Sequence, residues 1–382
     1  MGEKKPRIVF FVSEDWYFCS HRLPIARAAR DSGYEVWVIT RVKNHGKAIK
    51  DEGFFLLPLD FQRSGINIFS DAIALWRLIR FYRYLRPVIA HHVAIKPVLY
   101  GSIAARIAGV SSVVNALAGL GYLYSEDVKG LFLLLQPAVR IAMRLILLSS
   151  RGRVIVQNHA DYDSMHNHMG LLKQSLVLIR GSGVDMKHFA PTPEPSGPIR
   201  VTLVSRLLWE KGVGDLVKAA ELLRERGVRC VVTLVGDPDT ENAGAIDEEL
   251  LLKWAKSGAI EWWGRREDVA AVWAQSHIAC LPSYYREGVP KSLLEASACG
   301  RPIVTSDNPG CMEIVVDGEN GLVVPARDSC ALADAIEKLV KDSVLRQKMG
   351  SQGRKMVGLG FSEEQVADKT LTLYEELRQK NG

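Results

Sequence analysis

Short apolar runs alternate with amphipathic stretches along the whole chain. Uninterrupted apolar strands separated by helices are typical of parallel sheets that are covered on both faces. The pattern therefore predicts an α/β protein with two doubly wound, Rossmann-like parallel-sheet domains facing a central cleft. The predicted strands are residues 7–12, 35–40, 54–59, 87–92, 112–117 and 153–158 in the first half, and 200–205, 229–236, 259–264, 277–282, 302–306 and 321–325 in the second.

The boundary between the two domains is predicted from proline content. The stretch PTPEPSGP, residues 191–198, holds four prolines in eight residues and cannot join either sheet, so we interpret it as a stiff linker. Residues 1–190 then form the N-terminal domain and residues 199–360 the C-terminal domain. The last segment, residues 361–382, predicts a helix that lies beyond the final strand and can pack on either domain, or cross back to the first.

Two carboxylates bracket the run EGVPKSLLE in the second half. Pro290 suits the first position of a helix, and Gly288 and Val289 just before it present backbone N–H groups at the helix's positive end, which favours an anion. Glu295, more than one turn inside that helix, would repel a phosphate and so is expected to meet hydroxyl groups, whereas Glu287 precedes the helix. A ligand with both phosphate and vicinal hydroxyls indicates a nucleotide or a nucleotide sugar.

Two cations follow the strand at 200–205. Arg206 and Lys211 lie five residues apart across a strand-to-helix loop, the edge of a parallel sheet where ligands bind. A guanidinium and an ammonium there can converge on a diphosphate. The alternative is a surface ion pair with Glu210.

Other clusters of polar residues indicate a ligand site less specifically. Residues 237–239, Asp-Pro-Asp, resemble a metal-binding pair, but the proline favours turn aspartates that accept hydrogen bonds. The cluster HADYDSMHNH, residues 159–168, would spread its ligands around a helix, so we interpret it as solvated. Arg265 and Arg266 follow a strand and either read a base edge or solvate a turn. No metal site is predicted.

Composition restricts the class of protein. Of the 382 residues, 47% are hydrophobic and 24% charged, which is typical of a globular protein with sizeable cores and not of a disordered chain. The six cysteines form no CxxC pair, which favours a reducing compartment. The N-terminus has no apolar stretch of signal-peptide type, so a cytoplasmic location is expected.

The N-terminal half is basic. Residues 1–190 hold 25 Lys+Arg against 14 Asp+Glu. Because large aliphatic side chains are interleaved with these cations, nucleic acid is not the expected partner. Residues 130–153 combine an apolar face with Arg140 and Arg144, which predicts either a helix lying on an anionic membrane surface or a core helix with a basic face; residues 75–87 favour the second interpretation. Neither stretch is long and apolar enough to span a membrane.

Several motifs together resemble glycosyltransferase family 4 of the GT-B fold, over essentially the whole chain. In order, the motifs are SR at 205–206, EKG at 210–212, LVGDPD at 234–239, WWGRREDV at 262–269, the run from LPSYYREGVP to IVTSD at 281–307, and GCMEIVVDGENGLVVP at 310–325. In this order and spacing they are far more specific than any one motif.

The resemblance implies roles for residues in the C-terminal domain. Arg206 and Lys211 would neutralise the donor diphosphate, and Glu295 would bind the ribose hydroxyls. Glu287, with the backbone of residues 288–290, would hold the transferred sugar and the distal phosphate. The implied reaction is retaining transfer of a hexose or N-acetylhexosamine from a nucleoside-diphosphate sugar. UDP is the expected nucleotide, and no metal or other cofactor is expected to be required.

The N-terminal domain would supply the acceptor site. Its first loop carries W-x-x-x-S-H-R-L-P, as in a subset of the family, and His21 and Arg22 are expected to begin a helix where they are available to phosphate. The segment AHHVAIKP adds His91 and Lys96. Ala118 stands where many members of the family have histidine. The glycines of the same loop, Gly119 and Gly121, would let the backbone approach a substrate closely.

This subset implies a polyprenyl-diphosphate-linked glycan as acceptor, in O-antigen, capsule or glycoprotein assembly. The enzyme would then be peripheral on the inner face of the plasma membrane. Two alternatives stay open: a UDP-sugar 2-epimerase of the same fold, and a non-catalytic nucleotide-sugar-binding partner of another transferase.

Overall fold

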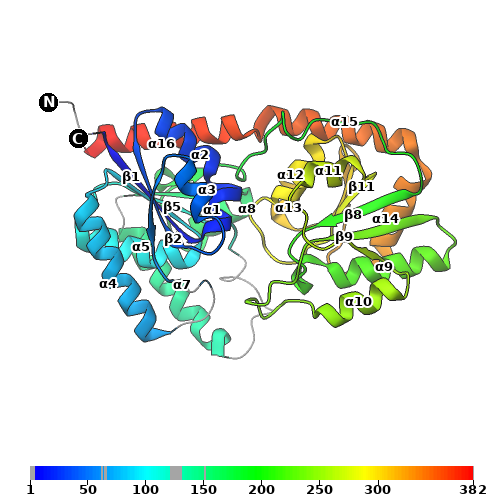
Figure 1. Ribbon diagram of the computed structural model, residues 1–382, viewed down its shortest axis with the longest axis horizontal. Coiled ribbons are helices and arrows are strands. Elements are labelled where there is room, and N and C mark those ends of the chain that lie inside the picture. The colour runs from blue at the N-terminus through cyan, green and yellow to red at the C-terminus, as the bar shows by residue number, and fades with distance from the viewer. Residues whose placement is uncertain (1–4, 62, 64–66, 121–130, 150–151, 382) are drawn as a thin grey trace. The chain divides into compact units, whose positions relative to one another are not determined.

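The computed structural model describes all residues except 1–4, 62, 64–66, 121–130, 150, 151 and 382. The chain divides into two compact units. Unit 1 comprises residues 1–182 together with residues 363–382, and unit 2 comprises residues 183–362. Each unit contains a parallel sheet with helices, as the hydrophobic pattern predicts (Figure 1).

Unit 1 is built on a seven-stranded parallel sheet of order β3-β2-β1-β4-β5-β6-β7. Its strands are β1 (Arg7–Glu14), β2 (Glu35–Arg41), β3 (Phe55–Pro58), β4 (Ile89–Val93), β5 (Val113–Ala116), β6 (Arg153–Val156) and β7 (Leu176–Leu178). Its helices are α1 (Asp15–His21), α2 (Leu23–Asp31), α3 (Gly46–Asp51), α4 (Ile68–Leu85), α5 (Ile95–Ala108), α7 (Leu131–Ser149), α8 (His159–Asn167), α16 (Glu363–Asn381) and the 3-10 turn η1 (Lys173–Ser175).

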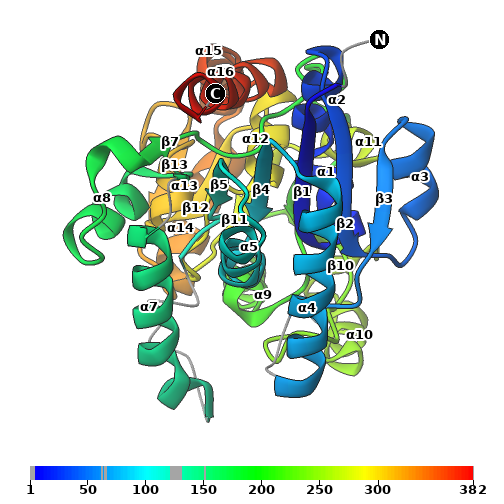
Figure 2. The ribbon, with the colours of Figure 1, turned by 90° about the vertical axis from the view of Figure 1, so that its left-hand side faces the viewer.

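Helices cover both faces of this sheet. Alternate residues of β1 point to opposite sides, so both faces are apolar and each packs against helices. Phe10 lies in the cluster that includes residues of α2 and α16, whereas Phe11 lies with residues of α4 and α5. Viewed from the side of unit 1, α4 and α5 are separate from α16, which lies beside α2 (Figure 2). The last helix of the chain therefore completes the core of the first unit.

Two adjacent histidines of β4 show how polar groups are accommodated in this core. His91 and His92 point to opposite faces, and both are buried. His92 Nδ1 lies 2.8 Å from Asn115 Oδ1, and its Nε2 lies 3.0 Å from Tyr82 Oη. His91 Nδ1 lies 2.5 Å from Tyr374 Oη of α16. Burial lowers the pKa of His92 to about 4 and holds the pKa of His91 well below its ordinary value.

These shifts predict a loss of stability in acid. The unfolded histidines titrate near 6.5, whereas the folded ones resist protonation, so their contribution is complete above about pH 6.5 and falls with pH toward 4. Each histidine should cost about 1.4 kcal/mol per pH unit in that window. Urea unfolding at pH 5 and 6 should give a shallower pH slope for His91→Phe than for the wild type. Between pH 7 and 8 the two slopes should agree, and equal slopes below pH 6.5 would contradict the prediction.

Unit 2 is built on a six-stranded parallel sheet of order β10-β9-β8-β11-β12-β13. Its strands are β8 (Ile199–Val204), β9 (Cys230–Val235), β10 (Glu261–Trp262), β11 (Ile278–Leu281), β12 (Ile303–Ser306) and β13 (Gly321–Val324). Its helices are α9 (Val213–Glu225), α10 (Glu248–Lys256), α11 (Val269–Ala274), α12 (Lys291–Ala298), α13 (Pro309–Met312), α14 (Ser329–Lys341), α15 (Ser343–Gly360) and the 3-10 turn η2 (Trp209–Lys211).

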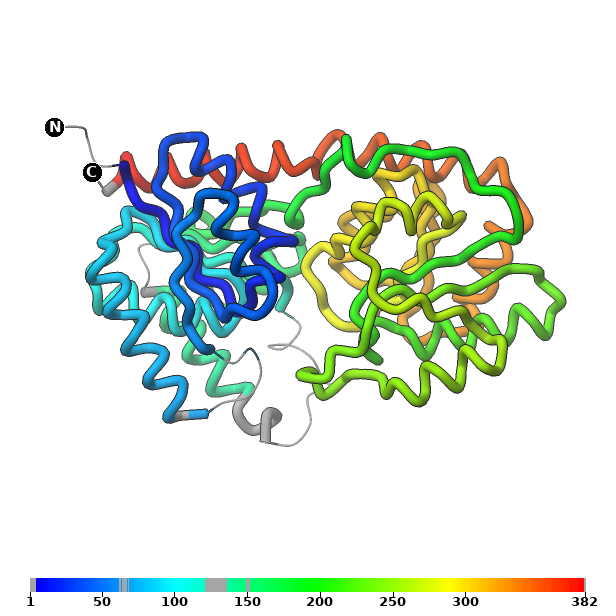
Figure 3. Tube along the Cα trace, viewed as in Figure 1, coloured from blue at the N-terminus to red at the C-terminus, as the bar shows by residue number. Residues whose placement is uncertain are grey.

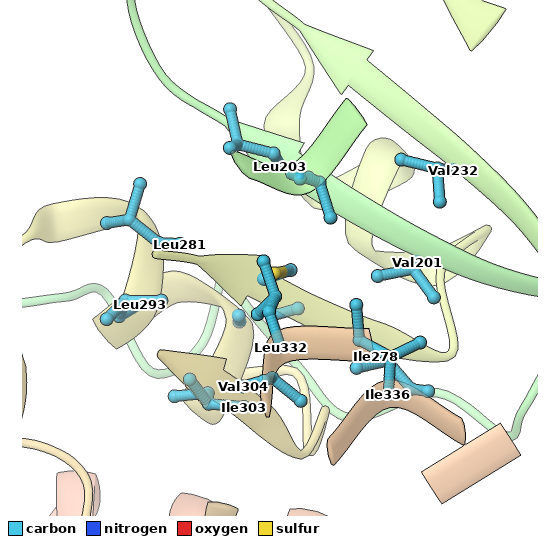
Figure 4. Close-up of a cluster of buried hydrophobic side chains, with 14 of the residues drawn as sticks. Val201, Leu203, Val232, Ile278, Leu281, Leu293, Ile303, Val304, Leu332 and Ile336 are labelled. Carbon is cyan, nitrogen blue, oxygen red and sulfur yellow. The ribbon is translucent and has the colours of Figure 1, made fainter. Parts of the chain in front are cut away.

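The core of unit 2 joins the central strands to the helices on the sheet. Val201 and Ile278 of the paired strands β8 and β11 lie with Leu332 and Ile336 of α14, and all four side chains are fully or almost fully buried (Figure 4). Leu293 of α12 belongs to the same cluster. This packing holds the two central strands against the helices, and the loops that carry Lys211 and Glu287 leave the carboxyl ends of these strands.

The proline-rich stretch 191–198 packs within unit 2, because the unit boundary falls at residues 182 and 183. Buried arginines hold it there. Arg301 donates to the carbonyl oxygen of Thr192 at 3.0 Å, and Arg346 forms a two-pronged ion pair with Glu194. The prolines keep the segment out of the sheet, as expected, but side chains elsewhere in the unit supply its hydrogen bonds. The tube in Figure 3 follows this path along the edge of the unit.

The two amphipathic helices of unit 1 differ from the simple core interpretation. Phe69, Ile73 and Trp76 of α4 are exposed, and so are Ile141 and Leu145 of α7. Among the described residues, no helix is long and apolar enough to cross a membrane. Both helices therefore expose large apolar side chains to solvent, which bears on the proposed function.

Candidate active site

The candidate site of unit 2 lies where strand order reverses. The chain runs outward from β8 to β9 and β10 on one side, and from β11 to β12 and β13 on the other. The loops after the neighbouring strands β8 and β11 therefore leave the sheet side by side, at the position where doubly wound folds bind ligands. Lys211 belongs to the first loop and Glu287 to the second.

Lys211 and Glu287 form an ion pair across this point. Their side chains are only 14% and 12% exposed, so the pair is largely removed from solvent. Lys211 ends η2, and Gly212, with φ of +73°, is the N-cap of α9. A Cβ atom at Gly212 would lie 2.1 Å from the carbonyl oxygen of Pro282, so only glycine permits the two loops to touch.

Further contacts fix the carboxylate of Glu287. Ser283 Oγ lies 2.5 Å from Glu287 Oε1 and 3.1 Å from the carbonyl oxygen of Glu210. The backbone N–H groups of Tyr284 and Tyr285 also donate to that carbonyl, at 3.1 and 3.3 Å. The loop after β11 is thus bonded to the loop that carries Lys211, and the ammonium and carboxylate are held in place before any ligand arrives.

Asn308, after β12, supports the same loop from the other side. Its Nδ2 donates to the carbonyl oxygens of Tyr285 and, at 3.3 Å, Ser283, while its Oδ1 accepts from the N–H of Gly310 at 3.2 Å. A Cβ atom at Gly310 would lie 1.6 Å from the carbonyl oxygen of Gly288. Ser283, Asn308 and Gly310 were not predicted as site residues from the sequence, although Asn-Pro-Gly after a strand is a turn signal.

Helix α12 begins one residue later than the sequence suggests. Pro290 is its N-cap and Lys291 its first residue. Gly288 and Val289 precede it and are buried, and Glu295 lies in the second turn, partly exposed. The positive end of the helix dipole therefore lies next to Glu287, as expected for an anion site.

Arg206 has a different acidic partner from the one considered in the sequence. It pairs with Asp239, in the loop after β9, at 2.5 Å, whereas Lys211 pairs with Glu287. Asp237 accepts a hydrogen bond from the backbone N–H of Arg265 at 3.0 Å, so both aspartates of the Asp-Pro-Asp turn bind arginine residues. Arg266 lies 5.7 Å from the ring of Trp263. Within the described part of the chain, no three His, Cys, Asp or Glu side chains gather as a metal site would require.

The histidine and arginine of unit 1's first loop are placed differently from the prediction. Residues 15–21 form helix α1, so His21 ends a helix and stacks on Tyr17 with ring centroids 4.1 Å apart. Arg22 is the N-cap of α2, and its side chain is buried. The prediction that both residues begin one helix is wrong, because the aromatic residues of this segment form a separate turn of helix on the sheet.

The other residues of unit 1 that were predicted to bind the acceptor lie in β4, in α5 and in the loop after β5. His91 lies inside β4 and not at its end, with Nδ1 on Tyr374. Lys96, in the first turn of α5, forms an ion pair with Asp71 at 3.0 Å and lies over the ring of Phe61. Gly119 has φ of +105°, which suits the backbone approach expected there, and Gly121 lies outside the described residues.

The chain matches two models of protein families. Residues 185–356 match glycosyl transferases group 1, and residues 7–158 match the glycosyl transferase 4-like model. Together the matches account for most of both units.

Two curated proteins are similar over most of their length. N,N'-diacetylbacillosaminyl-diphospho-undecaprenol alpha-1,3-N-acetylgalactosaminyltransferase of Campylobacter jejuni is 28% identical, with 93% of this chain and 94% of that protein covered. UDP-Gal:alpha-D-GlcNAc-diphosphoundecaprenol alpha-1,3-galactosyltransferase of Escherichia coli is 26% identical, with 84% and 83% covered.

Among solved structures, the sucrose-phosphate synthase of Thermosynechococcus elongatus has a TM-score of 0.82 over 98% of this chain and 100% of that one. At 19% identity this similarity concerns the fold. It supports the GT-B architecture of two parallel-sheet units.

Proposed function

This chain belongs to the glycosyl transferases of group 1, the family-4 transferases of GT-B fold, and on that premise we propose which sugar transfer it performs. The donor is a nucleoside-diphosphate sugar. UDP-N-acetylgalactosamine and UDP-N-acetylglucosamine are the first candidates to test. The acceptor is a polyprenyl-diphosphate-linked glycan, and the anomeric configuration of the hexose or N-acetylhexosamine is retained. The names of the two curated relatives, which act on undecaprenyl-diphosphate-linked sugars, support this acceptor class.

The single observation that carries the proposal is the Lys211–Glu287 pair at the reversal point of the second sheet. When the sugar leaves, negative charge develops on the diphosphate. A lysine that is already positioned beside the positive end of α12 stabilises that charge. Glu287 keeps the lysine in place and accepts hydrogen bonds from the transferred sugar once the ligand competes for the ammonium.

Other residues of unit 2 have subsidiary roles in the proposal. Arg206 exchanges Asp239 for a phosphate oxygen, and Glu295 accepts hydrogen bonds from the ribose hydroxyls. The backbone at residues 288–290 lines the distal phosphate and the sugar. Arg265 or Arg266 borders the base. With cations and a helix dipole on the diphosphate, these residues supply the charge stabilisation without a metal or other cofactor.

Unit 1 holds the acceptor in this proposal, through residues His21, Arg22, His91, Lys96, Gly119 and Gly121. The exposed apolar faces of α4 and α7 carry arginines and suit a peripheral position on the anionic inner face of the plasma membrane, where the lipid-linked acceptor resides. Arg80 lies over the ring of Trp76 at 4.7 Å, a pairing common at interfaces.

One experiment separates this function from its alternatives. The purified protein is given a panel of UDP- and other nucleotide sugars, with and without a short-chain polyprenyl-diphosphate N-acetylhexosamine in detergent. Nucleoside diphosphate and an extended lipid-linked glycan should appear only when donor and acceptor are both present. Isomerisation of a UDP-sugar without acceptor would instead identify a 2-epimerase, and binding without turnover under all conditions a non-catalytic partner.

Membrane attachment is tested by reversing two charges. Changing Arg140 and Arg144 to glutamate should at least halve the fraction of protein that floats with vesicles rich in anionic lipid at low salt, because each basic residue near such a surface contributes about 1 kcal/mol. The matched control changes Arg224 and Arg226 of unit 2 to glutamate and should leave flotation unchanged. Equal flotation of the wild type and both variants would contradict the proposed attachment.

A further inference from the structure

Two arginines of this chain are buried almost equally but differ in how many hydrogen bonds their guanidinium groups make. Arg301 of unit 2 is 2% exposed, and it donates hydrogen bonds to the carbonyl oxygens of Trp273, Thr192 and Pro193. Arg22 of unit 1 is 3% exposed, yet among the described residues its Nε and Nη2 atoms have no hydrogen-bond partner. The one side-chain hydrogen bond that Arg22 makes to a described residue is marginal, 3.5 Å from Nη1 to the carbonyl oxygen of His21.

A buried guanidinium that lacks hydrogen-bond partners lowers the stability of the folded protein. Buried polar groups are nearly always hydrogen-bonded, and a buried charge normally has an acid partner. No ion pair of Arg22 with an acid exists in the described part of the chain, whereas Arg41 and Arg346, also largely buried, pair with Glu14 and Glu194. Such a cost persists where the group serves a ligand.

A second unsatisfied group lies within electrostatic reach of Arg22. His91 is 1% exposed and uses Nδ1 on Tyr374, but its Nε2 has no partner among the described residues. The charge of Arg22 contributes to the depressed pKa of His91, so the two side chains are within electrostatic reach of each other. When the Tyr374 hydroxyl donates to Nδ1, Nε2 of the neutral ring carries the hydrogen and is a donor.

The position in the fold agrees with a ligand site. Strands β1 and β4 are neighbours, and the strand order of the first sheet reverses between them. Arg22 follows β1 as the N-cap of α2, a nine-residue helix whose N-terminus has no side-chain cap, and His91 belongs to β4. The first N–H groups of α2 have no partner within the helix, and Pro24 lacks one.

We infer that Arg22, His91 Nε2 and the N-terminus of α2 form a buried oxyanion site that takes a phosphate or diphosphate group. All of these groups are hydrogen-bond donors, and the net charge is positive. Donors with a net positive charge disfavour a metal ion and favour an oxyanion, which accepts hydrogen bonds from several donors. Under the proposed function, on which this identification rests, the ligand is the diphosphate of the lipid-linked acceptor; a free inorganic anion has the same chemistry.

The test measures heat stability with and without inorganic pyrophosphate, in a Lys211→Met background that removes the main cation of the candidate donor site. Pyrophosphate at about 100 times its Kd should raise Tm by roughly 5–10 °C. In Arg22→Met this rise should vanish. Because that variant removes an uncompensated buried charge, its Tm without ligand should equal or exceed that of the parent.

Arg301→Met is the matched control. It removes a satisfied buried arginine, so it should lower Tm without ligand and leave the pyrophosphate-induced rise intact. The inference is overturned if Arg22→Met lowers Tm as Arg301→Met does and pyrophosphate has no effect on the parent. It is also overturned if the pyrophosphate-induced rise persists in Arg22→Met.

A second measurement distinguishes the sources of the anion. With lipid-linked acceptor and nucleotide sugar, Arg22→Lys should raise the acceptor KM at least tenfold while the donor KM changes little; a change confined to the pyrophosphate response would assign the site to a free anion. If no transfer occurs with any acceptor but the pyrophosphate response still depends on Arg22, the proposed function fails and the oxyanion site stands.

Discussion

Replacing Lys211 with methionine should lower kcat/KM for sugar transfer by about 10²–10³-fold, the usual loss when one preorganised donor to a developing oxyanion is removed. Methionine keeps the length of the side chain and removes the charge. The effect should appear mainly in kcat, because the negative charge on the diphosphate grows as the sugar departs. Steady-state release of the nucleoside diphosphate measures it.

The variant also leaves Glu287 partly buried without its ammonium, so its stability needs a control. Lys211→Met with Glu287→Gln removes both charges, and it should regain stability while activity stays low. Lys341→Met breaks another Lys–Glu pair, with Glu337, but there the lysine is 66% exposed and the pair should contribute little to stability. Transfer at the wild-type rate by folded Lys211→Met would refute the assigned role.

Gly310→Ala should lower transfer by about 10²-fold, because a displacement of about 1 Å in a site can cost that much. The added methyl would lie 1.6 Å from the carbonyl oxygen of Gly288, and backbone cannot rotate away as a side chain can. The loop that carries Glu287 must therefore move relative to Lys211. We also expect a loss of about 1–3 kcal/mol in the free energy of unfolding. Kinetics and urea unfolding measure both effects.

Gly353→Ala is the matched control for this substitution. Gly353 lies in helix α15, and an added Cβ would make only ordinary contacts, the nearest at 3.4 Å from Ser297 Oγ. Alanine there should keep wild-type activity and equal or greater stability, since glycine is the poorer helix former. If Gly310→Ala matches Gly353→Ala in both measurements, the close approach of the two loops has no functional weight.

Much of the fold was predictable because apolar runs are a local signal. Each predicted strand overlaps a strand of the structure, and the α/β class and the two parallel sheets are confirmed. One strand of the structure, β7, was not predicted. It has only three residues and lies at the sheet edge, so it is too short to show a hydrophobic period. The separate helix α1 was also missed, since its aromatic residues resemble a buried loop as much as a helix.

The candidate site was predictable in residue type but not in partnership. The sequence indicated that Lys211 and Glu287 belong to loops at the ligand edge, because each follows a predicted strand. It contained nothing to show that they pair with each other or that Arg206 pairs with Asp239, since such contacts join loops far apart in the chain.

By itself, the sequence determined most of the strands and helices, the two-sheet class and the types of side chain available for a diphosphate, because these follow from hydrophobic period and from the chemistry of neighbouring residues. Only the tertiary structure decided which charges neutralise one another and which are left over. Arg22 and Arg301 are the same residue type and almost equally buried. Within the described part of the chain, however, Nε and Nη2 of Arg22 have no hydrogen-bond partner, whereas Arg301 donates to three carbonyl oxygens. That difference depends on which distant carbonyl and carboxylate groups the folded chain brings within 3 Å or so, and no local pattern encodes it.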